Sequence, residues 1–404
     1  MASKETHESR ITGAASVVGS FTVLSRVLGY IRDGTVAYVF GAGMQADAFF
    51  AAFRIANLLR RLVGEGALTS SFIPIFTDVL STRSTADARR VSSSVFTLFA
   101  FILITLSIIG ILASDWLVWA MSPGFAADPE KFHLTVRLTQ FMFPYMLFIG
   151  LMAIAMGVLN SLKHFAAPAA APIFLNISIV ACVFLAAPFL KEKAYSLAIG
   201  VLIGGVMQFA VQLPYLKKFS MSPSVSFAFF DPAIKKIFLL MGPAAFGVGV
   251  YQLNLFVTMW FASGLAEGSV SYLYYAGRLM EIPIGVFGVA VSTAVLPSLS
   301  EHAAKEEWAE FRSSVSFALR IVAFVTIPAT VGLIILNRPI IEVLFKRGSF
   351  GGLAVDGTSS ALFYYALGLV PVSISRILAS VFYSRKDAAT PVWAGLVSFV
   401  FNVI

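Results

Sequence analysis

Long apolar stretches dominate this 404-residue sequence, and they constrain the fold more than any other feature. A run of about 20 apolar residues is long enough to cross the hydrocarbon core of a bilayer as a helix. Only 12% of the residues are charged, whereas a soluble domain carries about 25%. The sequence therefore predicts an all-α polytopic membrane protein.

Proline, glycine and charged clusters divide the apolar stretches into about eleven predicted spans. These spans cover residues 12–40, 47–80, 91–113, 134–160, 168–189, 195–216, 233–263, 268–297, 310–336, 357–383 and 391–404. The stretches 114–121 and 338–346 are too short to span and are predicted to lie at the membrane interface. Residues 12–40 are too long and too interrupted by arginine for a signal peptide, so they are predicted to form the first span.

Lysine and arginine are unevenly distributed between the two sets of predicted loops. The set on the side of the N-terminus carries more of them, and cytoplasmic loops have an excess of these residues. The N-terminus is therefore predicted to be cytoplasmic.

The sequence offers no positive sign of an enzyme, a cofactor site or a nucleic-acid partner. The net charge of +8 is dispersed over short loops rather than concentrated in a soluble basic module. The four histidines lie far apart without metal-ligand spacing, and Cys182 stands alone, which excludes an intramolecular disulfide. Walker A, Gly-x-Ser-x-Gly and His-Glu-x-x-His patterns do not occur.

Two pairs of similar segments indicate an internal duplication at an offset of 223 residues. Asn160–Pro168 resembles Tyr383–Pro391, and Leu68–Pro74 resembles Val291–Pro297. A repeat of six spans places both halves in the same orientation, related by an axis along the membrane normal.

The duplication predicts the domain organisation. The expected parts are an N-terminal lobe (1–216), a cytoplasmic linker (217–236) and a C-terminal lobe (237–404). The counterpart of the sixth span falls near 418–439, beyond Ile404. The second lobe is therefore expected to be incomplete and the chain truncated.

Ionisable residues interrupt three of the predicted spans. Each costs about 2.5–3.5 kcal/mol at the centre of a spanning helix, so such residues usually face the protein interior or a water-filled cavity. The first span contains Arg26, Arg32 and Asp33. The second span contains Asp47, Arg54, Arg60, Arg61 and Glu65, with the polar Asn57 close by. The eighth carries a polar stripe of Ser271, Tyr274, Arg278 and Glu281.

Arginines outnumber carboxylates in these three spans. One interpretation is that the charges pair across helices and only stabilise the fold. The other is that excess positive charge in a wet cavity binds an anion, for which the planar guanidinium favours phosphate oxygens. The second interpretation predicts a ligand that carries phosphate or pyrophosphate.

Six motifs in these spans and later in the chain are similar to those of the MurJ/MviN lipid II flippases of the MOP exporter superfamily. The motifs are Ser25–Asp33, Phe40–Phe50, Asn57–Gly66, Tyr274–Pro283, Leu296–Ser300 and Phe382–Asp387. The chain departs from the family at Ala56, where proline is usual, and at Gly277, where aspartate is common. The first departure puts a bend of the second span in doubt, and the second removes one charge.

This resemblance implies two six-helix lobes around a cationic cavity. It also implies that lipid II, an undecaprenyl-pyrophosphate disaccharide-pentapeptide, moves from the cytoplasmic to the outer leaflet by alternating access. We expect a bacterial inner-membrane location, a role in peptidoglycan synthesis, and energy from an Na⁺ or H⁺ gradient or the membrane potential. Membrane lipids and cell-wall synthesis proteins are the other expected partners.

The resemblance and the charge pattern together predict the site residues. Arg26, Arg32, Arg60, Arg61 and Arg278 are expected to bind the substrate. The expected gating or charge-partner residues are Asp33, Asp47, Arg54, Glu65 and Glu281.

Two other functions fit the same architecture. One is export of another polyprenyl-linked glycan, and the other is a non-transporting membrane scaffold for cell-wall enzymes. A scaffold would not require Arg32 or Arg278, whereas a transporter of an anionic headgroup would. A multidrug exporter is disfavoured because such exporters take cationic cargo in acidic cavities.

Overall fold

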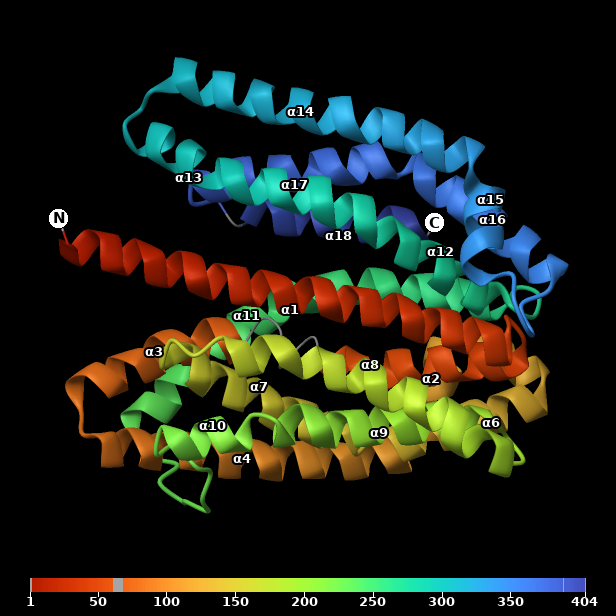
Figure 1. The fold of residues 1–404 in the computed structure, drawn as a ribbon, viewed down its shortest axis with the longest axis horizontal. Coiled ribbons are helices and arrows are strands. Elements are labelled where there is room, and N and C mark those ends of the chain that lie inside the picture. The colour runs from red at the N-terminus through yellow and green to blue at the C-terminus, as the bar shows by residue number, and fades with distance from the viewer. Residues whose placement is uncertain (1, 61–67, 388, 404) are drawn as a thin grey trace. The chain divides into compact units, whose positions relative to one another are not determined.

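The computed structural model describes the backbone of residues 2–60, 68–387 and 389–403, and helices make up nearly all of this part (Figure 1). The helices fall into two compact units. The first unit comprises residues 1–36 and 48–264, and the second comprises residues 37–47 and 265–404. The all-α architecture predicted from the apolar stretches is confirmed.

The first unit contains most of the helices before residue 264. They are α1 (Ala2–Phe40, except its last turn), α2 (Met44–Arg60, from residue 48), α3 (Leu68–Thr82), α4 (Thr85–Leu112), α5 (Ser114–Met121), α6 (Pro129–Met142), α7 (Tyr145–Ser161), α8 (Ala166–Ala186), α9 (Ala194–Ala210), α10 (Leu213–Lys218) and α11 (Pro232–Ser263). Helix α7 contacts α3, α4 and α9, so it forms the centre of this unit.

The second unit contains the remaining helices. They are α12 (Ser269–Pro283), a π-helical turn (Ile284–Val289), α13 (Ala290–Ala304), α14 (Trp308–Ile335), α15 (Asn337–Phe345), α16 (Gly352–Leu367), α17 (Leu369–Ser384) and α18 (Ala389–Val403). Helix α14 packs against α13, α16 and α17, and α12 packs against α16. Tyr275, Phe345 and Phe350 form an aromatic cluster at one end, with ring centroids 5.1–5.8 Å apart.

The helix boundaries repeat along the chain at the offset found in the sequence. Helices α4 and α14 both have 28 residues and start 223 positions apart, at Thr85 and Trp308. The starts of α5 and α15, of α6 and α16, and of α8 and α18 differ by 223 as well. Even the left-handed residue that follows α7, Lys163 (φ 59°), has its counterpart after α17 in Lys386 (φ 62°). The duplication predicted from short motifs therefore extends to the helix ends.

One predicted span is continuous and its repeat counterpart is bent. The span predicted at 134–160 lies within a single span, Pro129–Ser161, in which Phe143 and Pro144 separate α6 from α7 while keeping helical backbone angles. Its repeat counterpart consists of α16 and α17, which are bent by 43°. Pro144 has no backbone N–H to donate, so the hydrogen-bond ladder lapses between α6 and α7.

Five helical segments in the described part are long and apolar enough to cross a membrane, or six if α16 and α17 form one bent span. Two other predicted spans, 47–80 and 268–297, each correspond to two α-helices of 15 or 17 residues, α2 with α3 and α12 with α13. The predicted interfacial stretches coincide with the short helices α5 and α15.

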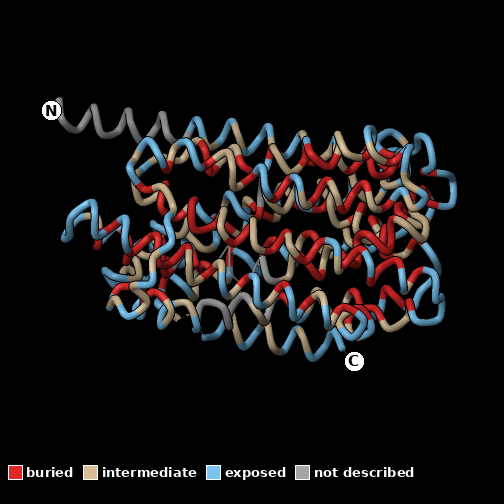
Figure 2. The backbone as a smooth tube through the Cα atoms, turned by 90° about the horizontal axis from the view of Figure 1, so that it is seen from below, coloured by how far each residue is buried: buried red, intermediate tan, exposed pale blue. Residues whose placement is uncertain are grey.

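The spanning helices are apolar on both their inner and outer faces, and buried and exposed positions alternate along them (Figure 2). Helix α4 buries Val95, Phe99 and Leu103 against the core of the first unit. On its other face Phe101 and Ile108 are 69% and 53% exposed. An apolar outer face suits lipid, because the hydrocarbon core offers no hydrogen-bonding partner.

The turn between α1 and α2 packs within the second unit. The backbone N–H of Ser349 donates to the carbonyl of Tyr38 (2.8 Å), and the hydroxyl of Tyr275 donates to the carbonyl of Gly41 (3.2 Å). Gly41 has φ +62°, and a Cβ there would overlap the backbone carbonyl of Ser349. Glycine is thus required by both conformation and space.

Replacing Gly41 by alanine is therefore expected to lower the stability of the second unit by about 1–3 kcal/mol. Gly34→Ala is the matched control, because nothing lies within 4 Å of a Cβ added to Gly34. Thermal unfolding in detergent measures both. An unfolding temperature for Gly41→Ala equal to that of Gly34→Ala would contradict the account.

The start of α11 is stabilised by an ion pair within the first unit. Asp231 accepts a hydrogen bond from the backbone N–H of Ala233 (2.8 Å) and one from Arg83 (2.8 Å). Partial burial by itself would raise the pKa of Asp231, but the Ala233 N–H and the Arg83 guanidinium outweigh it and hold that pKa below its ordinary value.

A carboxyl group with a lowered pKa contributes stability above its ordinary pKa and loses that contribution as the pH falls through the folded-state value. Asp231→Asn keeps a capping oxygen but removes the charge. The stability that this variant loses therefore reports the ion pair with Arg83. We expect a loss of about 0.5–1 kcal/mol of unfolding free energy at neutral pH. This loss shrinks as the pH falls through the lowered folded-state pKa of Asp231. Unfolding of Asp231→Asn, Arg83→Gln and the double variant across pH measures this coupling. Coupling that persists unchanged at low pH would contradict it.

Candidate functional site

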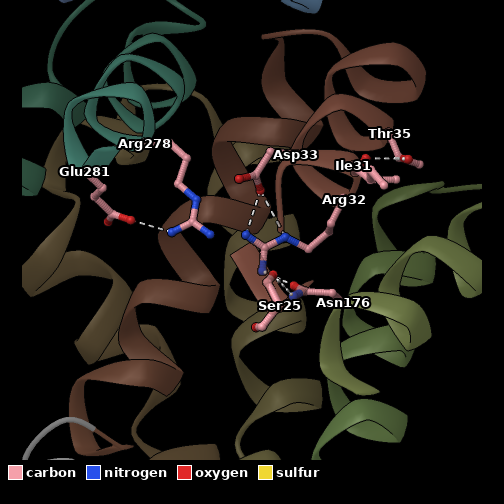
Figure 3. A network of polar contacts seen from close by, with 8 residues as sticks. All are labelled: Ser25, Ile31, Arg32, Asp33, Thr35, Asn176, Arg278 and Glu281. Carbon is pink, nitrogen blue, oxygen red and sulfur yellow. Dashed lines mark hydrogen bonds and ion pairs between the residues drawn. The ribbon is translucent and has the colours of Figure 1, made fainter. Parts of the chain in front are cut away.

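The charged group on α1 forms a buried network within the first unit (Figure 3). Nε and Nη2 of Arg32 both donate to one carboxylate oxygen of Asp33, at 3.0 and 2.7 Å. The Arg32 side chain is 11% exposed and that of Asp33 only 1%. Burying a charge pair this deeply costs free energy unless both groups are hydrogen-bonded. Arg32 and Asp33 are hydrogen-bonded to each other.

Asn176 on α8 completes this network, and sequence reasoning missed it. Its side-chain oxygen accepts from Nη1 of Arg32 (3.1 Å), and its amide nitrogen donates to the backbone carbonyl of Ser25 (3.1 Å). Asn176 is itself 6% exposed. The guanidinium plane is therefore fixed from two sides, by a carboxylate on its own helix and by an amide on α8.

Arg26 lies on the same helix but differs in its surroundings. It is exposed, whereas Asp33 seven residues later is buried. The helix face that their spacing predicts is therefore exposed at Arg26 and buried at Asp33.

The charged residues of the second predicted span (47–80) are described only in part. Arg54 is partly buried on α2 and takes part in polar interactions, and Asn57 does as well. Arg60 is the last residue of the helix. Arg61 and Glu65 lie outside the described residues, so their predicted roles remain predictions.

The second unit carries its own charged pair on α12 (Figure 3). Nη1 of Arg278 donates to Glu281 at 2.5 Å, at the i, i+3 spacing that places both side chains on one face of the helix. Arg278 is 25% and Glu281 60% exposed. This pair is therefore more open than the pair on α1.

Asp47 caps the N-terminus of α12. Its carboxylate accepts from the backbone N–H groups of Gly268 (2.8 Å) and Ser271 (2.9 Å), and from the Ser271 hydroxyl (2.6 Å). Helix α12 begins after Gly268, which has no side chain to act as a cap. A carboxylate at a helix N-terminus satisfies free N–H groups and interacts favourably with the helix dipole.

A second carboxylate, which lies just before α12, caps the start of α2 in return. Glu267 accepts from the backbone N–H of Met44 at the start of α2 (2.7 Å). Helices α2 and α12 are counterparts in the repeat. A carboxylate next to each helix start accepts a hydrogen bond from a backbone N–H at the start of the other helix. Both contacts lie within the second unit.

The arrangement suits anion recognition. Arg32 and Arg278 each lie on an apolar helix and are each oriented by a neighbouring carboxylate, so the cost of ordering the side chain is met before a ligand binds. Guanidinium groups fixed in this way can donate bidentately to phosphate oxygens.

Known proteins of one family are similar to the chain along almost its whole length. The profile of the family described as "Lipid II flippase MurJ" matches residues 36–404. The "Lipid II flippase MurJ" of Burkholderia cenocepacia is 40% identical over 383 residues, which cover 94% of this chain and 74% of that protein. The "Probable lipid II flippase MurJ" of Vibrio cholerae is 37% identical, covering 98% and 77%.

Solved structures show the same relationship. A structure titled "Lipid II flippase MurJ, inward closed conformation" superposes with a TM-score of 0.82 at 30% identity, covering 96% of this chain and 79% of the other. An inward-facing multidrug resistance MATE family transporter of the MOP superfamily has a TM-score of 0.75 at 15% identity, covering 96% and 88%. At that identity the second likeness concerns the fold alone.

Proposed function

This chain belongs to the lipid II flippase MurJ family, and from that premise we propose that it flips lipid II by alternating access. Lipid II is the precursor of peptidoglycan, so the chain acts in cell-wall synthesis. The observation that best supports anion recognition is the buried network of Arg32, Asp33 and Asn176 on otherwise apolar helices. A charge kept at such a position is a marker of function in membrane proteins.

The arginines are proposed to bind the pyrophosphate and the adjoining headgroup. Arg32 and Arg278 carry most of this binding, because each is held by a carboxylate that orients its guanidinium. The proposed substrate-binding set is Arg26, Arg32, Arg60, Arg61 and Arg278. Arg54 and Glu65 adjust its charge.

Asp33 and Glu281 are proposed to release their arginines to the substrate in part. A phosphate oxygen competes with a carboxylate for the same N–H donors, so substrate binding weakens each ion pair. This exchange is the proposed gating step, in which Arg32 gives up part of its contact with Asp33 when the pyrophosphate binds.

Asp47 is proposed to act as a second gating residue. Its three hydrogen bonds fix the first turn of α2 to the start of α12. Breaking them frees three donors at once, so the contact is either fully formed or lost.

Membrane orientation and coupling complete the proposal. The N-terminus lies in the cytoplasm of a bacterium, and lipid II moves from the inner to the outer leaflet of the cytoplasmic membrane. An Na⁺ or H⁺ gradient or the membrane potential supplies the energy. Proteins of cell-wall synthesis consume the flipped product.

Reconstitution in proteoliposomes tests the substrate. Fluorescent lipid II and a polyprenyl-pyrophosphate carrying a different glycan are added in parallel, and the fraction reaching the far leaflet is measured by a membrane-impermeant quencher. We expect flipping of lipid II and little of the other glycan. Equal rates for both would indicate an exporter of polyprenyl-linked glycans in general, and no flipping of either would contradict the proposal.

A further inference from the structure

A segment without helical structure connects α10 to α11 and lies along α4 within the first unit. The backbone N–H of Ser224 donates to the hydroxyl of Ser93 (3.3 Å), and that of Ser226 donates to the hydroxyl of Thr97 (3.1 Å). The hydroxyls of Ser94 and Ser226 are 2.7 Å apart. One side of the segment is thereby fixed to α4.

The other side of this segment presents large apolar side chains. Val225 is 75% exposed, Phe227 73% and Phe230 99%. Val225 and Phe227 alternate with the hydrogen-bonded residues Ser224 and Ser226, so they point away from α4. Exposed apolar side chains that cluster in this way mark an interaction surface.

Lysines flank these apolar side chains on both sides along the chain. Lys217 and Lys218 precede the segment, Lys235 and Lys236 follow it, and all four are exposed. Asp231 is the single acidic residue between positions 213 and 236, and it pairs with Arg83. Any partner of this surface must therefore be both apolar and negatively charged.

Helix α4 gives the depth of the segment in the membrane. Its 28 residues extend about 42 Å, about 12 Å more than the hydrocarbon core. Trp116 and Trp119, 65% and 56% exposed, follow at its far end and are typical of the membrane interface. Counting about 20 residues back from Leu112 places the opposite boundary near Ser93.

Helix α11 indicates the same boundary. Lys235 and Lys236 are exposed in its first turns, and Leu239 and Leu240 follow with 66% and 48% exposure. A change from exposed lysine to exposed leucine within one turn is expected where a helix enters hydrocarbon.

We propose that residues 217–236 form an interfacial anchor for negatively charged phospholipids. Val225, Phe227 and Phe230 insert beside the upper acyl chains, and the four lysines contact headgroup phosphates. Apolar insertion combined with a basic cluster is the pairing that holds segments at a membrane surface. The anchor ties the start of α11 to the lipid surface, independently of which substrate is flipped.

Fluorescence quenching in nanodiscs tests the anchor. Cys182 is the single cysteine of the chain, so Cys182→Ala provides a cysteine-free background. An environment-sensitive fluorophore is attached at Phe227→Cys, with Val225→Cys as a second site and the exposed Ser81→Cys as the control. The nanodiscs contain phosphatidylcholine with or without phosphatidylglycerol.

We expect nitroxide lipids labelled near the headgroup to quench the probes at 225 and 227, and aqueous iodide to quench the probe at 81. Nitroxide on phosphatidylglycerol should quench about two-fold more than nitroxide on phosphatidylcholine. That preference should disappear when all four lysines are replaced by glutamine.

Three outcomes would overturn the proposal. Iodide quenching at 227 as strong as at 81 would show that the segment faces water. Shielding from both quenchers would show that protein covers it. Equal quenching by labelled phosphatidylglycerol and phosphatidylcholine in the unmodified chain would show that the lysines do not select negatively charged lipids.

Discussion

Replacement of Arg32 by alanine is expected to reduce lipid II flipping in proteoliposomes by about 30-fold or more. Arg32 makes charge-assisted hydrogen bonds from a site with 11% exposure, where losing one partner of a charge pair costs about 2–5 kcal/mol. About 2 kcal/mol is already 30-fold in an equilibrium constant. Arg32→Lys should be almost as defective, because an ammonium group cannot reproduce the fork that contacts Asp33 and Asn176.

Two further variants separate function from folding. Arg32→Ala also removes the partner of the buried Asp33, which destabilises the fold. Arg32→Gln combined with Asp33→Asn removes both charges, so it should unfold near the normal temperature yet remain inactive. Arg338→Ala is the matched control, because Arg338 is 55% exposed and pairs on the surface with Asp356. Normal flipping by the double variant would exclude a role for the Arg32 charge.

Replacement of Asp47 by alanine is expected to have the second largest effect. The change removes three hydrogen bonds from the start of α12, including two from backbone N–H groups. Loss of a capping side chain costs about 1 kcal/mol, and loss of a charged acceptor from buried donors raises this to about 2–4 kcal/mol. Both the unfolding temperature and the flipping rate should fall.

Hydrogen exchange locates the effect of this change. The amides of Gly268 and Ser271 should exchange about 30-fold faster in Asp47→Ala, because their acceptor is gone. Asp47→Asn keeps one acceptor oxygen and should show an intermediate rate. Asp87→Ala, which alters an exposed residue in the first turn of α4, serves as the control. Unchanged exchange at Gly268 and Ser271 would contradict the capping role.

The fold could be predicted largely from the sequence because membrane helices follow local rules. Apolar runs, prolines and charged loops located the helices, although the spans predicted at 47–80 and 268–297 each contain two α-helices. The short motifs at 160–168 and 383–391 revealed the offset that the helix boundaries follow. The grouping of helices was beyond such rules. Residues 37–47, which include the turn between α1 and α2, pack with helices that begin more than 200 residues later. Local sequence patterns cannot predict such a contact.

The predicted lobes and the packing units are defined by different properties. The lobes 1–216 and 237–404 were inferred from sequence similarity, and they remain a prediction about the duplication. The units reflect contacts, in which α11 packs against α3 and α5 of the first unit. A helix can belong to one repeat by descent and to another unit by packing.

The site could be predicted in its charged residues but not in its neutral ones. Arg32, Asp33, Arg278 and Glu281 attracted attention because charge is rare in an apolar span. Asn176 gave no such signal, since it lies 144 positions from Arg32 and a single amide in a span has many uses. Asp47 was predicted as a gating or charge-partner residue, and its hydrogen bonds to Gly268 and Ser271 add a capping function that the sequence did not indicate. Its gating role remains a proposal.

The dissociation constant for lipid II tests the central claim most directly, because it isolates recognition of the pyrophosphate from transport. Purified chain in nanodiscs is titrated with lipid II and with the corresponding lipid monophosphate, using the unmodified chain, Arg32→Ala, Arg278→Ala and Arg338→Ala. We predict that the unmodified chain and Arg338→Ala bind lipid II equally and prefer it to the monophosphate. Arg32→Ala and Arg278→Ala should each bind about 30-fold more weakly and lose that preference. Unaltered affinity and preference in both variants would contradict the claim that these arginines recognise the pyrophosphate.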